Sequence, residues 1–142
     1  MPPPLNHPCL HLELLPQTFF VKQLPADAGI PPEIFNELNV QGGSDIHRLF
    51  SVTRTAEEIS IVGESATEEG GDWRCIKIAG PMDFGLTGVV NSFTSPLKDA
   101  GVPVFAISTW NTDYVLVPKA QADRAVAALC ADQWTFVISV EE

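Results

Sequence analysis

Hydrophobic and polar positions follow regular spacings along the second half of the chain. Residues 75–79 alternate between apolar and polar side chains, which is typical of a half-buried strand. Further on, apolar side chains recur with the spacing of an amphipathic helix at Leu86, Val89, Val90, Phe93 and Leu97. Asp83 or Phe84 precedes the first turn of this predicted helix and Gly101 follows its last turn. Pro96 lies inside the pattern and predicts a kink or a shorter helix.

The rest of the second half predicts two more strands, a second helix and a closing strand. The apolar runs at residues 104–107 and 114–117 indicate strands, and residues 134–140 indicate the closing one. Between them, residues 120–131 carry a helical stripe of Ala122, Ala125, Val126 and Leu129. The order β-α-β-β-α-β predicts an antiparallel ferredoxin-like sheet with its helices on one face.

The first half predicts a degenerate version of the same unit. Residues 10–15 and 18–21 are expected to pair as a hairpin around Pro16, followed by a short helix from Pro32 to Leu38. Residues 49–53 and 59–62 predict two more strands, and the polar segment 63–72 is a linker. We therefore expect an α+β protein of two tandem ferredoxin-like units, residues 1–68 and 69–142.

Charge and composition exclude several classes of function. The 142 residues carry 18 acidic and 8 basic side chains, a net charge of −10, with no cluster of lysine and arginine. Such a chain repels phosphate backbones and anionic lipid surfaces, so neither nucleic acid nor membrane is an expected partner. Only 18% of the residues are charged, which weakly favours self-association, and we expect a homodimer.

The cysteines and the start of the chain point to the cytoplasm. Cys9, Cys75 and Cys130 lie far apart and include no CxxC pair, so neither a disulfide framework nor a zinc site is predicted. The chain begins without a basic and apolar signal segment, and no apolar run approaches the roughly 18 residues of a membrane span.

Two segments carry residues suited to binding a small zwitterion. The first joins a strand to a helix N-terminus, whose free N–H groups bind carboxylates, and consists of Asp83, Phe84, Gly85, Leu86, Thr87 and Gly88. The second connects two apolar strands without a glycine, and its candidate ligands are Ser108, Thr109, Asn111, Thr112 and Asp113. Hydroxyl and backbone groups suit the ends of such a ligand, and the Asp113 carboxylate suits an amine.

A purely structural explanation exists for each segment. Asp83 is a favoured helix cap, and the second segment could form a turn whose hydroxyls satisfy its own backbone. No HExxH, GxSxG or phosphate-loop sequence occurs, so we expect no enzyme, no cofactor and no metal. A nucleophilic pair of Cys75 and His47 is an unfavoured alternative, because isolated cysteines are usually buried hydrophobic residues.

The second segment, with the strand that follows it (residues 108–117), resembles the β-hairpin of ACT domains in aspartokinases and in CASTOR-type arginine sensors. Residues 83–88, 50–55 and 57–62 also resemble parts of this group. The resemblance implies a regulatory domain that binds an amino acid where the helix N-terminus of one unit meets the hairpin of another. CASTOR proteins carry four such units and this chain has two, so a second copy could supply the missing half.

Arginine or lysine is the expected ligand, because the chain is acidic, Asp83 and Asp113 lie in the two segments, and the resemblance is to arginine sensors. The alternative is a constitutive protein-interaction module that keeps the fold without the ligand, with a regulatory protein as its partner.

Overall fold

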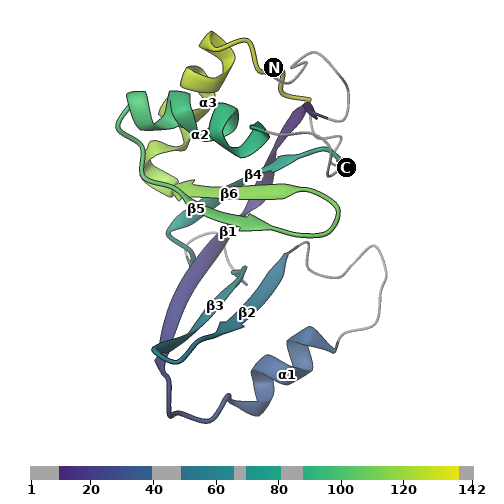
Figure 1. Cartoon of the computed structure of the whole chain (residues 1–142), viewed down its shortest axis with the longest axis vertical. Helices are drawn as coiled ribbons and strands as arrows, with labels where there is room; N and C mark the ends of the chain where they lie inside the picture. The colour runs from purple at the N-terminus through teal and green to yellow at the C-terminus, as the bar shows by residue number, and fades with distance from the viewer. Residues whose placement is uncertain (1–9, 40–48, 66–69, 81–87, 138–142) are drawn as a thin grey trace. The chain divides into compact units, whose positions relative to one another are not determined.

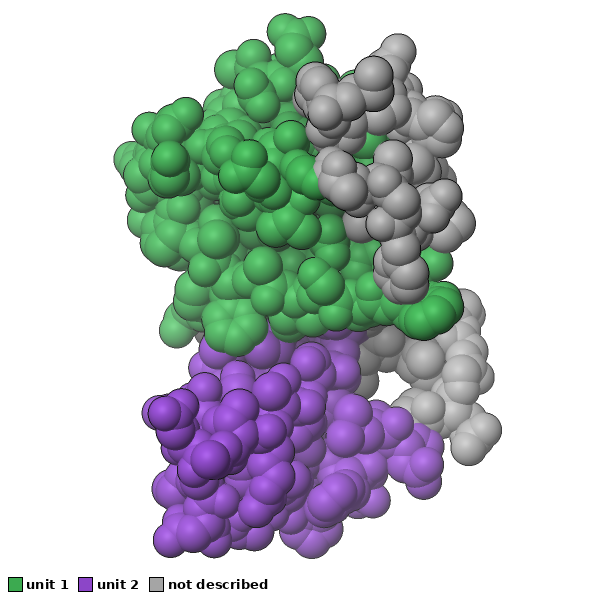
Figure 2. All heavy atoms as spheres, viewed as in Figure 1, with its two compact units in different colours: residues 1–16, 72–142 green, residues 17–71 purple. Residues whose placement is uncertain are grey.

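The computed structural model describes residues 10–39, 49–65, 70–80 and 88–137 (Figure 1). The chain divides into two compact units, one of residues 1–16 with 72–142 and one of residues 17–71 (Figure 2). This division differs from the expected 1–68 and 69–142, because the N-terminal residues group with the C-terminal half. No helix among the described residues is long and apolar enough to cross a membrane.

The first unit contains β4 (Trp73–Ile78), α2 (Val89–Asp99), β5 (Phe105–Ser108), β6 (Asp113–Pro118), a short 3-10 turn (Lys119–Gln121) and α3 (Ala122–Ala131). The start of β1 (Leu12–Pro25) also belongs to it, and the strand order is β1-β4-β6-β5. The strand β6 is antiparallel to β4, with Cys75 opposite Leu116, and to β5, with Phe105 opposite the same residue. Figure 1 shows α2 and α3 together on one side of these strands. The predicted α+β class with an antiparallel sheet is confirmed.

A single hydrophobic core joins the helices of this unit to its strands. Phe93 and Leu97 of α2 and Leu129 of α3 are fully buried against Ile76 and Ile78 of β4. Trp134 lies 5.5 Å from Phe93, measured between ring centroids. The helical stripes read from the sequence therefore form this core, except that Val126 is only partly buried.

The second unit is built from β1, α1 (Pro32–Leu38), β2 (Phe50–Arg54) and β3 (Glu58–Glu64). Its strand order is β2-β3-β1, and both pairings are antiparallel. The turn between β2 and β3 is closed by Thr55, whose hydroxyl accepts hydrogen bonds from the backbone N–H groups of Glu57 and Glu58, both at 3.1 Å. The predicted short helix and both predicted strands after it are present.

The predicted hairpin around Pro16 is wrong. Residues 12–25 form one continuous strand, β1. From Phe19 onward β1 pairs with β3, whereas before Pro16 the backbone of His11 accepts a hydrogen bond from Ala79 at 2.7 Å. Proline lacks a backbone N–H and so breaks a ladder of hydrogen bonds. Here Pro16 lies where β1 changes units, and the chain does not turn.

The start of the long helix also differs from the expectation. The helix α2 begins at Val89, three residues after the predicted start, because Gly88 precedes it in a left-handed conformation with φ of 77°. Pro96 does not shorten the helix, which continues to Asp99. The predicted closing strand is reduced, among the described residues, to a parallel bridge between Phe136 and Leu12.

Candidate functional site

The turn between β5 and β6 is organised by the side chain of Thr109. Its hydroxyl donates to the backbone oxygen of Thr112 at 3.0 Å and accepts from the N–H groups of Asn111 and Thr112, both at 3.3 Å. The N–H of Thr109 also donates to the oxygen of Thr112, at 2.8 Å. This is a turn whose hydroxyl satisfies its own backbone, the structural alternative considered for this segment. Ligand contact by Thr109 stays a prediction.

A second hydroxyl ties the same turn to the end of β4. Thr112 is 1% exposed, and its hydroxyl donates to the backbone oxygen of Ile78 at 2.8 Å. Gly80 lies against it, since a Cβ at this position would fall 2.9 Å from the Cβ of Thr112 and 3.1 Å from the oxygen of Asn111. Gly80 also has φ of 64°, a conformation that favours glycine. The turn and the end of β4 are therefore in direct contact.

This contact brings the two predicted ligand segments together at one edge of the first unit. The first segment begins three residues after Gly80, and its residues Asp83, Phe84, Gly85, Leu86 and Thr87 lie outside the described residues. Gly88, its last residue, is exposed at the start of α2, and a Cβ there would meet nothing within 4 Å. Sequence reasoning missed Gly80, which it treated only as a strand breaker. Its position directly after the alternating strand was the available signal.

The exposure of the second segment separates its side chains into two groups. Ser108 and Asn111 are exposed, and Trp110 between them is 84% exposed. Asp113, the predicted partner of an amine, begins β6 opposite Ser108 and is only 8% exposed. A ligand approaching this edge from solvent would therefore meet Ser108 and Asn111 first and Asp113 at greater depth.

Ionisable groups on β4 and β6 lie one register step from the turn. The Nζ atom of Lys77 is 6.0 Å from the ring centroid of Tyr114, the residue after Asp113. Burial raises the pKa of Tyr114 above its ordinary value, and the charges of Cys75 and Glu13 raise it further. Burial also raises the pKa of the Cys75 thiol to about 12, a shift that Lys77 opposes and Glu13 reinforces.

The raised pKa speaks against Cys75 as a nucleophile. The thiolate is the reactive form of cysteine, and a thiol with a pKa of about 12 stays protonated at neutral pH. His47, its proposed partner, lies outside the described residues. Among the described residues, no three histidine, cysteine, aspartate or glutamate side chains gather closely enough to hold a metal ion.

Comparison with known families identifies the larger unit. Residues 68–131 match the ACT domain family, and the match runs from before β4 to the end of α3. The chain contains an ACT domain. ACT domains are ligand-binding regulatory modules, and the resemblance seen in residues 83–88 and 108–117 is confirmed.

Curated relatives of this ACT domain include a cytosolic arginine sensor. The chain is 31% identical over 90 residues to the bovine "Cytosolic arginine sensor for mTORC1 subunit 1", a match that covers 54% of the chain and 27% of the bovine protein. The human protein of the same name is 40% identical over 48 residues, covering 33% of the chain and 15% of that protein. The match therefore spans about a quarter of the bovine relative and less of the human one.

Solved structures resemble almost the whole chain. Protein Atu0741 from Agobacterium tumefaciens is 27% identical with a TM-score of 0.74, and the alignment covers 96% of this chain and 98% of that one. Protein VC0802 from Vibrio cholerae has a TM-score of 0.62 at 17% identity, with 92% and 94% covered. Aspartate kinase from Synechocystis has a TM-score of 0.59 at 17% identity, with 95% of this chain and 28% of the kinase covered. The last two likenesses show the fold alone.

Proposed function

We propose that this ACT protein is a cytosolic regulatory module, not an enzyme, that binds a free amino acid and acts as a homodimer. The contact of the β5–β6 turn with the end of β4 carries this proposal. It holds the turn in place through Thr112 and Gly80 and leaves Ser108 and Asn111 exposed beside it. A binding site preformed in this way loses little conformational freedom when a ligand arrives.

The chemistry of this edge suits both ends of an amino acid. The carboxylate of the ligand would lie near the N-terminus of α2, beside the segment Asp83, Phe84, Gly85, Leu86, Thr87 and Gly88. Its amine would approach Asp113, and Ser108 and Asn111 would contact it from the exposed side. The hydroxyls of Thr109 and Thr112 would act by orienting the turn, since both already bond to backbone oxygens. Arginine or lysine is our first choice, supported by the net charge of −10 and by the name of the bovine relative.

We also propose that the chain holds two tandem ACT units, divided near residue 68. The order of elements supports this, because β1-α1-β2-β3 and β4-α2-β5-β6 repeat the same β-α-β-β succession. In each, the third strand of the succession lies between the first and the second. The second unit lacks a counterpart of α3 among its described residues, which fits the description of a degenerate copy.

A constitutive protein-interaction module is the competing function. The turn satisfied by Thr109 and the 84% exposure of Trp110 favour it, because a hairpin tip of this kind can contact a protein without any ligand. In that case the homologous edge has kept its shape and lost its ligand.

A thermal-shift screen against all twenty amino acids separates the two functions. A ligand at 100 times its dissociation constant stabilises the folded state by about 2.7 kcal/mol, which raises Tm by several degrees. We expect a selective shift with arginine or lysine that Asp113→Asn removes. The exposed residue Asp123 on α3 offers a matched control, and Asp123→Asn should keep the shift. Flat curves across the panel would favour the interaction module.

A further inference from the structure

The strand β5 presents an open edge. It is the last strand in its sheet, and among the described residues only β6 pairs with it. The bond from the N–H of Thr109 to the oxygen of Thr112 sets the alternation along β5. Residues 105, 107 and 109 direct their backbone groups toward β6, so Ala106 and Ser108 direct theirs outward. Val104, two residues before Ala106, continues this outward series.

This edge carries none of the usual protection against strand pairing. Natural edge strands are generally guarded by charged side chains, above all lysine, that discourage another strand from adding. Residues 101–112 contain no charged side chain, although the whole chain has a net charge of −10. Large apolar side chains are exposed along this edge instead, with Val104 39% and Trp110 84% exposed, and Val90 of α2 is 41% exposed.

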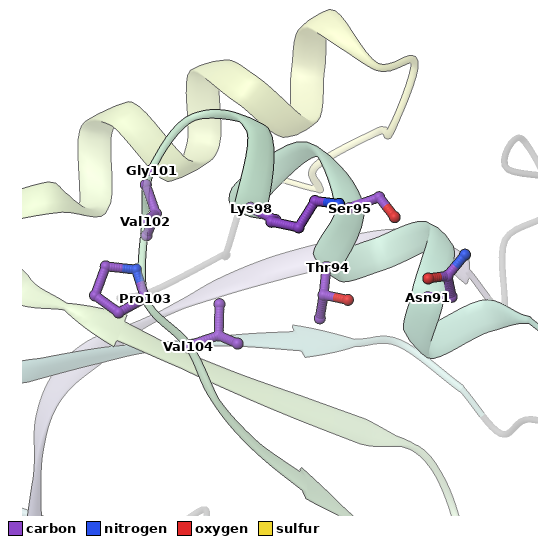
Figure 3. Close-up of a pocket in the computed structure, with 8 residues that line it drawn as sticks. All are labelled: Asn91, Thr94, Ser95, Lys98, Gly101, Val102, Pro103 and Val104. Carbon is purple, nitrogen blue, oxygen red and sulfur yellow. The ribbon is translucent and has the colours of Figure 1, made fainter.

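A groove runs beside the same edge, between α2 and the segment that leads into β5. Its volume is about 650 Å³. The wall from α2 is polar, with Asn91, Thr94, Ser95 and Lys98, and the facing wall is largely apolar, with Gly101, Val102, Pro103 and Val104. Figure 3 shows Thr94 on the helix wall and Val104 on the facing one. The groove therefore adjoins the outward-facing backbone of β5.

We propose that β5 pairs antiparallel with β5 of a second copy, about a twofold axis at Ala106. In this register Ala106 exchanges backbone hydrogen bonds with its own copy, and Val104 does so with Ser108 of the partner subunit. These are the residues whose backbone groups face outward. The same register places Trp110 opposite Val102 of the partner subunit, which lines the partner's groove. Each copy thus brings its hairpin tip to the groove of the other.

The positions of these features favour a second copy over an unrelated strand. Val104 and Ser108 lie symmetrically about Ala106, and so do the groove residue Val102 and the exposed Trp110. An interface with twofold symmetry must be complementary to itself, and this edge has both the protruding part and the groove that receives it. Ala106 also has the small side chain that a residue facing its own copy needs. This inference rests on the proposed homodimer and not on the proposed ligand.

Sedimentation equilibrium over a range of protein concentrations, without any amino acid present, tests the interface. We expect the wild-type chain to be a dimer and Ala106→Lys to be a monomer, because two lysines would face each other across the axis. Trp110→Ala should weaken the dimer by at least about 30-fold, which is the 2 kcal/mol threshold of an interface hot spot converted at 1.4 kcal/mol per tenfold. Ala120→Lys and Phe35→Ala, at exposed positions away from this edge, should leave the dimer unchanged.

Disulfide crosslinking tests the register independently. In a background with Cys9 and Cys130 replaced by serine, Ala106→Cys should form a dimer crosslink on oxidation, because directly opposite Cα atoms lie about 5.5 Å apart. Val104→Cys should not, since four residues of strand place it about 14 Å along the axis from its own copy. A wild-type monomer would overturn the dimer itself. A dimer that resists Ala106→Lys, or that crosslinks through Val104→Cys, would overturn this interface alone.

Discussion

Replacing Thr112 with valine tests the contact that holds the turn against β4. The two side chains have nearly the same shape, so the change removes the hydroxyl and little else. In the wild type this hydroxyl donates to the backbone oxygen of Ile78 at 2.8 Å, and the threonine is 1% exposed. Water cannot readily replace the lost donor at such a site, so the Ile78 oxygen loses a hydrogen bond without compensation. Losing a buried partner in this way costs about 1–3 kcal/mol.

Urea unfolding and a thermal melt measure this loss. For a chain of this size, 1–3 kcal/mol corresponds to a fall in Tm of roughly 3–10 °C. Thr112→Ser is the matched control, because it keeps the hydroxyl and removes only a methyl group, and it should lie closer to the wild type than Thr112→Val. If valine changes the free energy of unfolding by less than about 0.5 kcal/mol, or serine costs as much as valine, the hydrogen bond does not hold the turn.

Two glycines and two cysteines provide further tests. Gly80→Ala should destabilise by about 2–4 kcal/mol in urea unfolding, since it combines a left-handed φ of 64° with a Cβ 2.9 Å from Thr112. Gly101→Ala, with φ of 76° and open space around it, should cost only about 1–2 kcal/mol, and equal costs would contradict the clash at Gly80. At pH 8, iodoacetamide should label exposed Cys130 in the folded protein and buried Cys75 only after unfolding, and peptide mapping that finds equal rates would contradict the burial. Because the pKa of Cys75 rises from 9.0 to about 12 on folding, its contribution to stability is full below pH 9. It then falls by up to about 1.4 kcal/mol per pH unit toward pH 12, which urea unfolding at each pH would measure.

Local chemistry explains which parts of the fold were predictable. The helical stripe through Phe93 and Leu97 needs only a period near 3.6 residues, and both side chains are buried as expected. Gly101 ends α2 as predicted: its N–H donates to the oxygen of Lys98 at 3.0 Å, and that of Val102 donates to the oxygen of Leu97 at 2.9 Å. Helix ends of this kind depend on a few consecutive residues, so the sequence alone reveals them.

Long-range pairing explains what was missed. Pro16 is typical of a turn by local chemistry, yet β1 continues through it because strands remote in sequence pair with it on both sides. No spacing in the sequence shows which strands those are. The same holds for the candidate site, where Thr112 is recognisable as a turn residue but its partner, the Ile78 oxygen, lies 34 residues away. The role of Gly80 depends on that contact and became visible only with it.

Titration followed by ¹⁵N NMR tests the central claim most directly, because it reports both binding and its location. L-arginine and L-lysine would each be added in millimolar steps to the wild-type chain, with L-glutamate as an acidic control. We predict that the basic amino acids shift the amide signals of Gly80, Gly88 and residues 108–113, and that glutamate leaves them unchanged. Shifts confined to other regions would contradict the proposed site, and no shift with either basic amino acid would contradict the proposed ligand.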